Sequence, residues 1–189
     1  MKEIKLLKSA QIELSNQPVS IDEAIATHRV VLHNSQEIIS SVLAIEKQLE
    51  FAISFYLLGT DSSKRTFFES IILKSDWCGF SAKRKVILAI LNQSNVVEGE
   101  EKSKLDTLLA KAMRYRNAFA HGEVHQTPKG VFLKYFEGQP REEELTDAYW
   151  DRVQADFEET HQFVMLMLKR LGALRAPAPP VAGAPAESA

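Results

Sequence analysis

Hydrophobic residues recur at steps of three and four along most of this chain, which is the pattern of amphipathic α-helices. The longest such pattern predicts a helix over residues 35–58. Its apolar positions are Ile38, Val42, Ile45, Leu49, Ala52 and Tyr56. Gly59 follows and is suited to end a helix. Upstream, Ser20 and Glu23 have the spacing of a capping box, so a short helix is expected after Ser20.

Three further patterns predict helices over residues 63–74, 82–92 and about 100–119. The loop between the first two, residues 75–80, carries aromatic side chains that can anchor it. Ser81 is expected to cap the helix that follows this loop. The apolar stripe of the third helix consists of Leu105, Leu108, Leu109 and Ala112.

The period of the pattern changes after Gly122. Residues 131–136 are rich in β-forming side chains, a turn signal precedes them at 128–130, and residues 123–127 can form a partner strand. The sequence therefore predicts a small β-hairpin. A last helix is expected over residues 146–172, with an apolar stripe that can serve either a core or a helix–helix dimer seam. That stripe consists of Trp150, Val153, Phe157, Val164, Leu168 and Leu171.

Together these elements predict one all-α domain, an up-and-down helical bundle with a small β-hairpin inserted before the last helix. A chain of 189 residues, 45% of them hydrophobic, can bury a core for such a domain. We expect residues 35–172 to form the domain and residues 1–34 to be a partly ordered N-terminal segment. Residues 173–189 are rich in alanine and proline, cannot build a core, and are expected to be disordered.

Charge and composition limit the classes of function. The net charge is −2 and the pI is about 6.2, so any contact with nucleic acid must be local. The single cysteine, Cys78, excludes an internal disulfide and fits a reducing compartment. The first residues lack the long apolar core of a secretory signal, and no apolar run approaches about 18 residues. We therefore expect no membrane span and a cytoplasmic location.

The most informative stretch is residues 114–122, Arg-Tyr-Arg-Asn-Ala-Phe-Ala-His-Gly, at the end of a helical pattern. Arg116 lies eleven residues after Leu105, about 20° away on a helical wheel. It is therefore expected on the apolar face, where an unpaired arginine is costly. Asn117 and His121 are four residues apart and share a neighbouring face if the helix persists.

An arginine and a histidine this close together suit cleavage of RNA without a metal. The histidine titrates near neutral pH and can take a proton from a 2′-hydroxyl. The arginine offers fixed donors that hold a negatively charged phosphate. The alternative is structural: Arg116 and Asn117 tie down the helix end, and His121 is a structural residue.

The pattern R-N-x-x-x-H, which runs from Arg116 to His121 and ends in Ala-His-Gly, resembles the signature of HEPN domains. These are all-helical domains of prokaryotic defence and toxin–antitoxin systems, and some eukaryotic nucleases also contain them. The earlier segments 46–50 (Glu-Lys-Gln-Leu-Glu) and 80–83 (Phe-Ser-x-Lys) and the helix after the motif add to the likeness. The resemblance covers about residues 35–172, and the hairpin corresponds to an insertion that some members carry.

The resemblance implies a metal-independent endoribonuclease of a toxin–antitoxin or phage-defence system, without a cofactor. In such enzymes the motifs of two protomers meet across a dimer interface. A homodimer is therefore implied, and an antitoxin or nucleotidyltransferase is a candidate partner. By this resemblance His121 would be the general base or acid, and Arg116 would orient and neutralise the scissile phosphate. Asn117 would bind the phosphate or position the histidine, and the product would be a 2′,3′-cyclic phosphate.

Two other functions stay open. HEPN-like domains include non-catalytic members, so the chain could instead be a helical module that binds RNA or a partner protein without cutting it. The motif could also be a coincidence in a helical protein whose apolar stripe serves only assembly.

Several other residues are candidates for chemistry. Arg114 and Lys111 could bind RNA beside the motif, with a solvated helix face as the alternative. Residues 83–85 (Lys-Arg-Lys) are interpreted as a solvated helix start, although basic residues at that position also suit a phosphate contact. His161 lies beside the apolar stripe of the last helix and is expected to be a core histidine rather than part of a cleft. No zinc motif, phosphate-binding glycine loop or serine-hydrolase motif is present, so those chemistries are disfavoured.

Overall fold

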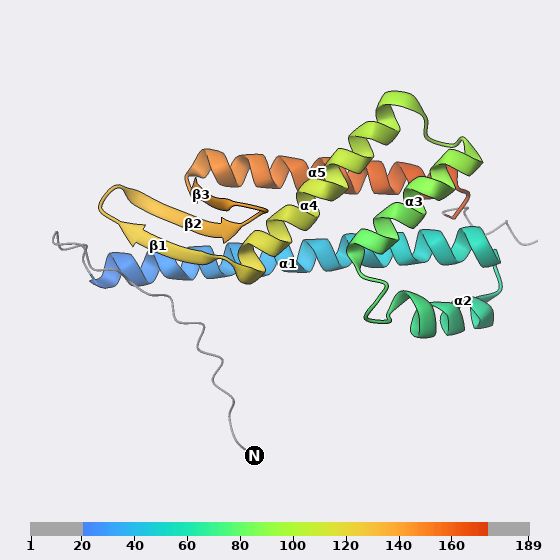
Figure 1. Cartoon of the computed structure of the whole chain (residues 1–189), viewed down its shortest axis with the longest axis horizontal. Helices are drawn as coiled ribbons and strands as arrows, with labels where there is room; N and C mark the ends of the chain where they lie inside the picture. The colour runs from blue at the N-terminus through green and yellow to red at the C-terminus, as the bar shows by residue number, and fades with distance from the viewer. Residues whose placement is uncertain (1–20, 174–189) are drawn as a thin grey trace, which may run out of the picture.

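The structure, a computed structural model, describes residues 21–173, and most of them are helical. In chain order the elements are α1 (Ile21–Leu58), α2 (Ser62–Phe68), the π-helical turn η1 (Glu69–Leu73), α3 (Phe80–Ser94), α4 (Gly99–His121), β1 (Glu123–Thr127), β2 (Gly130–Phe136), β3 (Pro140–Glu144) and α5 (Asp147–Arg170) (Figure 1). The expectation of a largely helical chain is confirmed. The expected capping role of Ser20 and the expected disorder of the tail after residue 173 lie outside the described residues.

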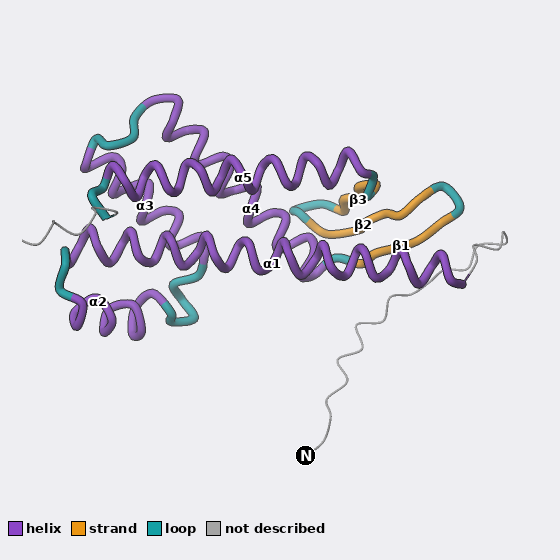
Figure 2. The backbone as a smooth tube through the Cα atoms, turned by 180° about the vertical axis from the view of Figure 1, so that it is seen from behind, coloured by secondary structure: helices purple, strands orange, loops and turns teal. Residues whose placement is uncertain are grey.

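Helices α1 and α5 lie side by side along the long axis, and α4 crosses them (Figures 1 and 2). Helix α3 packs on α1 and α4 near one end, where α2 also lies against α1. The sheet lies at the other end, beside the first half of α5 and the N-terminal part of α1 (Figure 2). This arrangement places the C-terminal end of α4 at the junction between the helices and the sheet.

Helix α1 extends further than the helix expected over residues 35–58. Its buried positions are Val31, Ile38, Val42, Ile45, Leu49, Ala52 and Ile53. Because this stripe continues upstream to Val31, the short helix expected after Ser20 is the first part of the same long helix. The expected end is confirmed: Gly59 has φ 63°, and its N–H donates to the Phe55 carbonyl at 2.8 Å.

The helix expected over residues 63–74 consists of α2 followed by η1. Asp61 caps α2, since its Oδ1 accepts a hydrogen bond from the backbone N–H of Lys64 at 3.1 Å. In η1, Glu69 Oε1 accepts a hydrogen bond from Ser54 Oγ of α1 at 2.5 Å. This bond ties the π-helical turn to the long helix.

The cap expected at Ser81 is wrong. Helix α3 begins two residues earlier than expected, at Phe80, with Gly79 in the N-cap position and no side-chain cap. Phe80 is buried in the core. Burial of its aromatic ring outweighs a single capping hydrogen bond, so packing rather than local capping decides where the helix begins.

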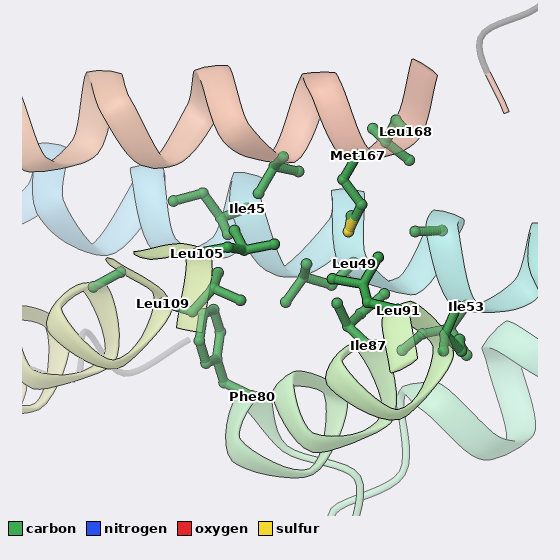
Figure 3. Close-up of a cluster of buried hydrophobic side chains, with 14 of the residues drawn as sticks. Ile45, Leu49, Ile53, Phe80, Ile87, Leu91, Leu105, Leu109, Met167 and Leu168 are labelled. Atoms are coloured by element: carbon green, nitrogen blue, oxygen red, sulfur yellow. The ribbon is translucent and has the colours of Figure 1, made fainter. Parts of the chain in front are cut away.

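Two clusters of buried side chains form the core. The larger lies between α1, α3, α4 and the end of α5 (Figure 3) and includes Ile45, Leu49, Ile53, Phe80, Ile87, Leu91, Leu105, Leu109, Met167 and Leu168. The smaller lies between α1, α4, α5 and the sheet and consists of Val31, Ile38, Tyr115, Ala118, Phe119, Leu133, Leu145, Tyr149 and Val153. Helix α4 therefore packs into both clusters.

The apolar stripe of α5 is used by these two clusters. Val153, Val164 and Leu168 are buried, and Trp150, Phe157 and Leu171 pack against the clusters as partly buried side chains. Of the two uses open to this stripe, packing within the chain is the one observed. The buried positions of the stripe are therefore used within the chain, whereas Trp150 and Phe157 also line a hollow between α1 and α5.

The hairpin expected from residues 123–127 and 131–136 is present as β1 and β2, and β3 extends it into a three-stranded antiparallel sheet. The sequence does not indicate β3, because Pro-Arg-Glu-Glu-Glu lacks β-forming side chains. The strand forms by pairing with β2, for example Tyr135 opposite Arg141. At this sheet edge its charged side chains reach water.

Candidate functional site

The buried face of α4 turns along the helix. Leu105 and Leu109 belong to the larger core cluster, whereas Tyr115 and Ala118 belong to the smaller one. Ala118 stands about 220° around the helix from Leu105. By this point in α4, the buried face has therefore turned away from the side of the helix that carries Arg116. The expectation that Arg116 lies on the apolar face is wrong: its side chain is exposed.

Arg116, Asn117 and His121 are all exposed on the last turns of α4. The helix persists to His121, so Asn117 and His121 share one face as expected. Arg116 Nη1 donates a hydrogen bond to Asn117 Oδ1 at 3.3 Å, and no carboxylate within residues 21–173 pairs with Arg116. Arg116 and His121 stand about 140° apart around the helix, with Asn117 between them.

The end of α4 is closed by the backbone and not by these side chains. The Gly122 N–H donates to the Ala118 carbonyl at 2.7 Å. A Cβ at Gly122 would lie 2.9 Å from Leu133 Cδ1 and 2.9 Å from the Lys134 carbonyl oxygen of β2, so glycine is needed there. In the described part of the chain, the motif side chains donate to no backbone carbonyl. The interpretation of the motif as a tether for the helix end finds no supporting contact.

The motif stands on an open surface of the single chain. None of its three residues lines the three hollows at α4–β3–α5, at the α1–α5 surface or at the end of α5 within residues 21–173. Acid–base catalysis needs its groups held around the substrate. One chain thus presents the required groups but does not enclose a substrate between them.

Lys111 and Arg114, the residues expected to bind RNA, line a separate hollow between α4, β3 and α5. Lys111 Nζ pairs with Asp156 Oδ1 at 2.7 Å, so its charge is used within the fold. The Arg114 guanidinium lies 5.5 Å from the centre of the Tyr115 ring, and no carboxylate in the described range pairs with it. Burial opposes its charge, but nearby oxygens, foremost that of Tyr115, hold the pKa of Arg114 above its ordinary value. Arg114 is thus available to an anion, and Lys111 is not.

Sequence reasoning missed the other walls of this hollow. Glu143 of β3 and Tyr149 and Arg152 of α5 line it together with Arg114. These residues meet because β3 packs beside the start of α5, and the sequence does not indicate β3. The only local feature of the sequence that could have indicated these walls is the aromatic pair Tyr149-Trp150 near the start of the last helix.

Lys83 is buried between two carboxylates of α1. Its Nζ donates to Glu46 Oε1 at 2.5 Å and to Glu50 Oε1 at 2.6 Å. Burial opposes its charge, but these two hydrogen bonds raise the pKa of Lys83 above its ordinary value. Arg84 pairs with Asp106 of α4 at 2.6 Å. The interpretation of this basic run as a solvated helix start is therefore wrong for Lys83 and Arg84, since both hold helices together.

His161 is exposed on α5, so the expectation of a core histidine is wrong. The residue falls at the outer edge of the stripe, where its Nδ1 lies 3.4 Å from Gln48 Nε2 of α1.

Nowhere in residues 21–173 do three or more histidine, cysteine, aspartate or glutamate side chains gather as they would around a metal ion. The helices described there include none with the length and apolar character that crossing a membrane demands.

The chain matches no protein-family model, no curated protein and no solved structure.

Proposed function

We propose that this protein is a metal-independent endoribonuclease of the HEPN type, with Arg116, Asn117 and His121 as its catalytic residues. One observation carries the proposal. These three polar side chains are exposed together at the end of α4, without a carboxylate partner in the described range and without a part in closing the helix. Polar groups that the fold does not use are available to a substrate.

The proposed reaction is an attack within the RNA strand. His121 takes the proton of a 2′-hydroxyl, and the 2′-oxygen forms a bond to the adjacent phosphorus. The bond from phosphorus to the 5′-oxygen breaks, and this oxygen receives a proton from a second histidine. Arg116 neutralises the phosphate with paired donors, and Asn117 directs the guanidinium through the hydrogen bond at its Oδ1. The products carry a 2′,3′-cyclic phosphate and a 5′-hydroxyl.

A homodimer would supply the second histidine. In one chain Arg116 and His121 diverge around α4 and are exposed, and neither lines the three hollows found among residues 21–173 that are described above. A second copy that faces the same surface in a two-fold arrangement would bring its own Arg116 and His121 opposite the first pair. We therefore propose the exposed end of α4 as the dimer interface, because the apolar stripe of α5 is already used in the core.

The first test is incubation of the purified protein with labelled RNA in excess EDTA. We expect cleavage that leaves 2′,3′-cyclic phosphate ends. His121→Ala should lower the rate about 100-fold or more, because a positioned general base is lost. Arg116→Ala should lower it about 100-fold, because the charge on the phosphate is no longer neutralised.

Two exposed residues outside the motif provide matched controls, His161→Ala on α5 and Arg29→Ala on α1. Both should cleave like the parent. Thermal unfolding of every variant separates loss of catalysis from loss of fold. Cleavage by His121→Ala at the parent rate would show that the residue assignment is wrong.

The proposed interface has its own test. The parent should be a dimer by light scattering at micromolar concentration, and Asn117→Trp should shift it to the monomer by placing a bulky ring in the contact. His161→Trp, an equally exposed site on α5, should stay dimeric. A monomeric parent would contradict the proposed composite site.

A second candidate is a non-catalytic module of the same type that binds RNA or a partner protein. The observation that favours it is the open surface around the motif, which offers contacts but no enclosure in one chain. A confirmed dimer that binds RNA and leaves it intact in the EDTA assay would support this candidate against the enzyme.

A further inference from the structure

The hollow between α4, β3 and α5 holds polar groups that the proposed reaction does not use. Its volume is about 490 Å³, and its walls include Arg114, Tyr115, Glu143, Tyr149, Arg152 and Asp156. That volume lies within the range of ~300–1,000 Å³ found for small-molecule sites. Its elements adjoin the C-terminal half of α4, the helix that ends in the motif (Figure 1).

The hydroxyl of Tyr149 has no hydrogen-bond partner in the described range, although Tyr149 is only 4% exposed and lines the hollow. Its backbone N–H is bonded to the Thr146 side chain at 3.2 Å, so the hydroxyl alone is unused. A hydroxyl without a protein partner at the wall of a hollow is open to a hydrogen bond with a ligand or water. Burial and the nearby Glu143 raise the pKa of Tyr149 far above its ordinary value, so this hydroxyl stays a neutral donor.

Two arginines, Arg114 and Arg152, line the hollow together with Tyr149. The Arg152 guanidinium lies 5.2 Å from the centre of the Tyr149 ring, and the Arg114 guanidinium lies 5.5 Å from that of Tyr115. Arg152 reaches Glu143 only at 3.4 Å, and its side chain is 58% exposed. Arg114 pairs with no carboxylate within residues 21–173. Both guanidinium groups therefore keep donors free for an anion.

Two carboxylates in the walls are already engaged. Asp156 accepts hydrogen bonds from Lys111 Nζ and from Tyr115 Oη, each at 2.7 Å. Glu143 accepts a hydrogen bond from Tyr135 Oη at 2.6 Å. These bonds satisfy Asp156 and Glu143 from within the fold, while the third wall carboxylate, Glu144, is exposed. An incoming anion is therefore expected to contact Arg114 and Arg152, and Glu144 is left to a hydrogen-bond donor.

We propose that this hollow binds one nucleotide of the RNA strand cleaved at the motif, with its phosphate held by Arg114, Arg152 and the Tyr149 hydroxyl. The inference rests on the proposed function. Arg114 lies seven residues before His121, about 20° from it around α4 and about 10 Å along the helix axis. A strand whose scissile phosphate lies at His121 therefore passes the rim of the hollow.

A nucleotide can contact more of the groups that line this hollow than a small inorganic anion can. Arginine planes stack on bases, and the Arg152 side chain is 58% exposed. Glu144, exposed at the rim, can accept a hydrogen bond from a ribose hydroxyl or a base amino group. The same chemistry is found in a free nucleotide and in a nucleotide within RNA, so the experiment must separate these two sources.

The test uses the full chain and a short 2′-O-methylated oligoribonucleotide, which lacks the attacking hydroxyl and reports binding without cleavage. Arg114→Gln should weaken binding about 10-fold to 100-fold, because a charged hydrogen-bond donor is lost. Tyr149→Phe should weaken it about threefold to tenfold, because only a neutral hydroxyl is removed. Fluorescence anisotropy measures both.

Matched controls are Arg29→Gln and Tyr56→Phe, since neither residue lines the hollow. Both control variants should bind like the parent. Tyr149→Phe removes one oxygen atom only, so its effect on binding is not expected to come from unfolding. Unchanged binding by Arg114→Gln and Tyr149→Phe would overturn the proposal. Binding of free ribonucleoside 3′-monophosphates alone, with the same dependence on Arg114 and Tyr149, would assign the hollow to a free nucleotide and also overturn its role with RNA.

Failure of this inference is distinguishable from failure of the proposed function. The binding assay tests the hollow, whereas the comparison of cleavage in EDTA by the parent and by His121→Ala tests the motif. Suppose that cleavage depends on His121 but oligonucleotide binding does not depend on Arg114 or Tyr149. This result would support the proposed enzyme and exclude the nucleotide-binding site in the hollow.

Discussion

At the scale of single residues, Arg116 shows that a position in a helical pattern does not by itself decide whether the side chain is buried or exposed. Counting from Leu105 places Arg116 on the apolar face of α4, yet its side chain is exposed. The count assumes that one face stays buried along the whole helix. In this protein the helix passes from one core cluster to the other, and its buried face turns.

Gly122 gives a prediction at this scale. Gly122→Ala should lower the free energy of unfolding by about 2 kcal/mol, because the added Cβ would collide with the Ala118 carbonyl oxygen of α4 and with Leu133 and Lys134 of β2. Gly79→Ala is the control, since a Cβ there meets nothing within 4 Å, and its effect should stay below about 1 kcal/mol. Urea denaturation measures both. Equal stability of Gly122→Ala and the parent would contradict the close approach of the helix end to β2.

At the scale of elements, charged side chains decide how α3 sits on its neighbours. Lys83 joins α3 to Glu46 and Glu50 of α1, and Arg84 joins α3 to Asp106 of α4. A sequence pattern marks such residues only as a basic run. Their burial follows from where α1 and α4 lie, which no local pattern records.

The Lys83 cluster gives the prediction for this scale. Lys83→Met should destabilise the protein by about 3 kcal/mol, because Glu46 and Glu50 are left facing each other with little access to water. Lys85→Met, two residues later and exposed, should have little effect. Adding Glu50→Gln to Lys83→Met should restore part of the loss. Chemical denaturation of the three variants checks this, and a Lys83→Met protein as stable as Lys85→Met would refute it.

At the scale of the whole molecule, two core clusters share α4, and Figure 3 shows the larger of them. The motif lies at the end of α4, where the helices meet the sheet (Figure 1). Tyrosine and lysine side chains in and around these clusters have pKa values above their ordinary values. Burial, with a hydrogen bond to Glu143, raises the pKa of Tyr135 to about 12. The ion pairs raise the pKa of Lys83 above its ordinary value.

These shifts predict loss of stability at alkaline pH. A pKa that is higher in the folded protein than in the unfolded chain stabilises the fold below the unfolded value. That contribution is lost as pH rises through the folded value. The free energy of unfolding should therefore fall above about pH 10. Tyr135→Phe and Lys83→Met should each make this fall shallower in urea titrations from neutral pH to about pH 11, and identical slopes would contradict the assignment.

The sequence by itself determined which stretches become helices and which become the hairpin, and which residues make up the motif, but not the start of α1 or of α3. Apolar spacing and turn residues act over a few positions, so α1, α4 and α5 follow from local physics. Only the tertiary structure decided that Arg116 is exposed, that Lys83 is buried, and that Tyr149 faces a hollow beside Arg114. These outcomes depend on which elements pack together, and burial is settled by neighbours distant in the chain.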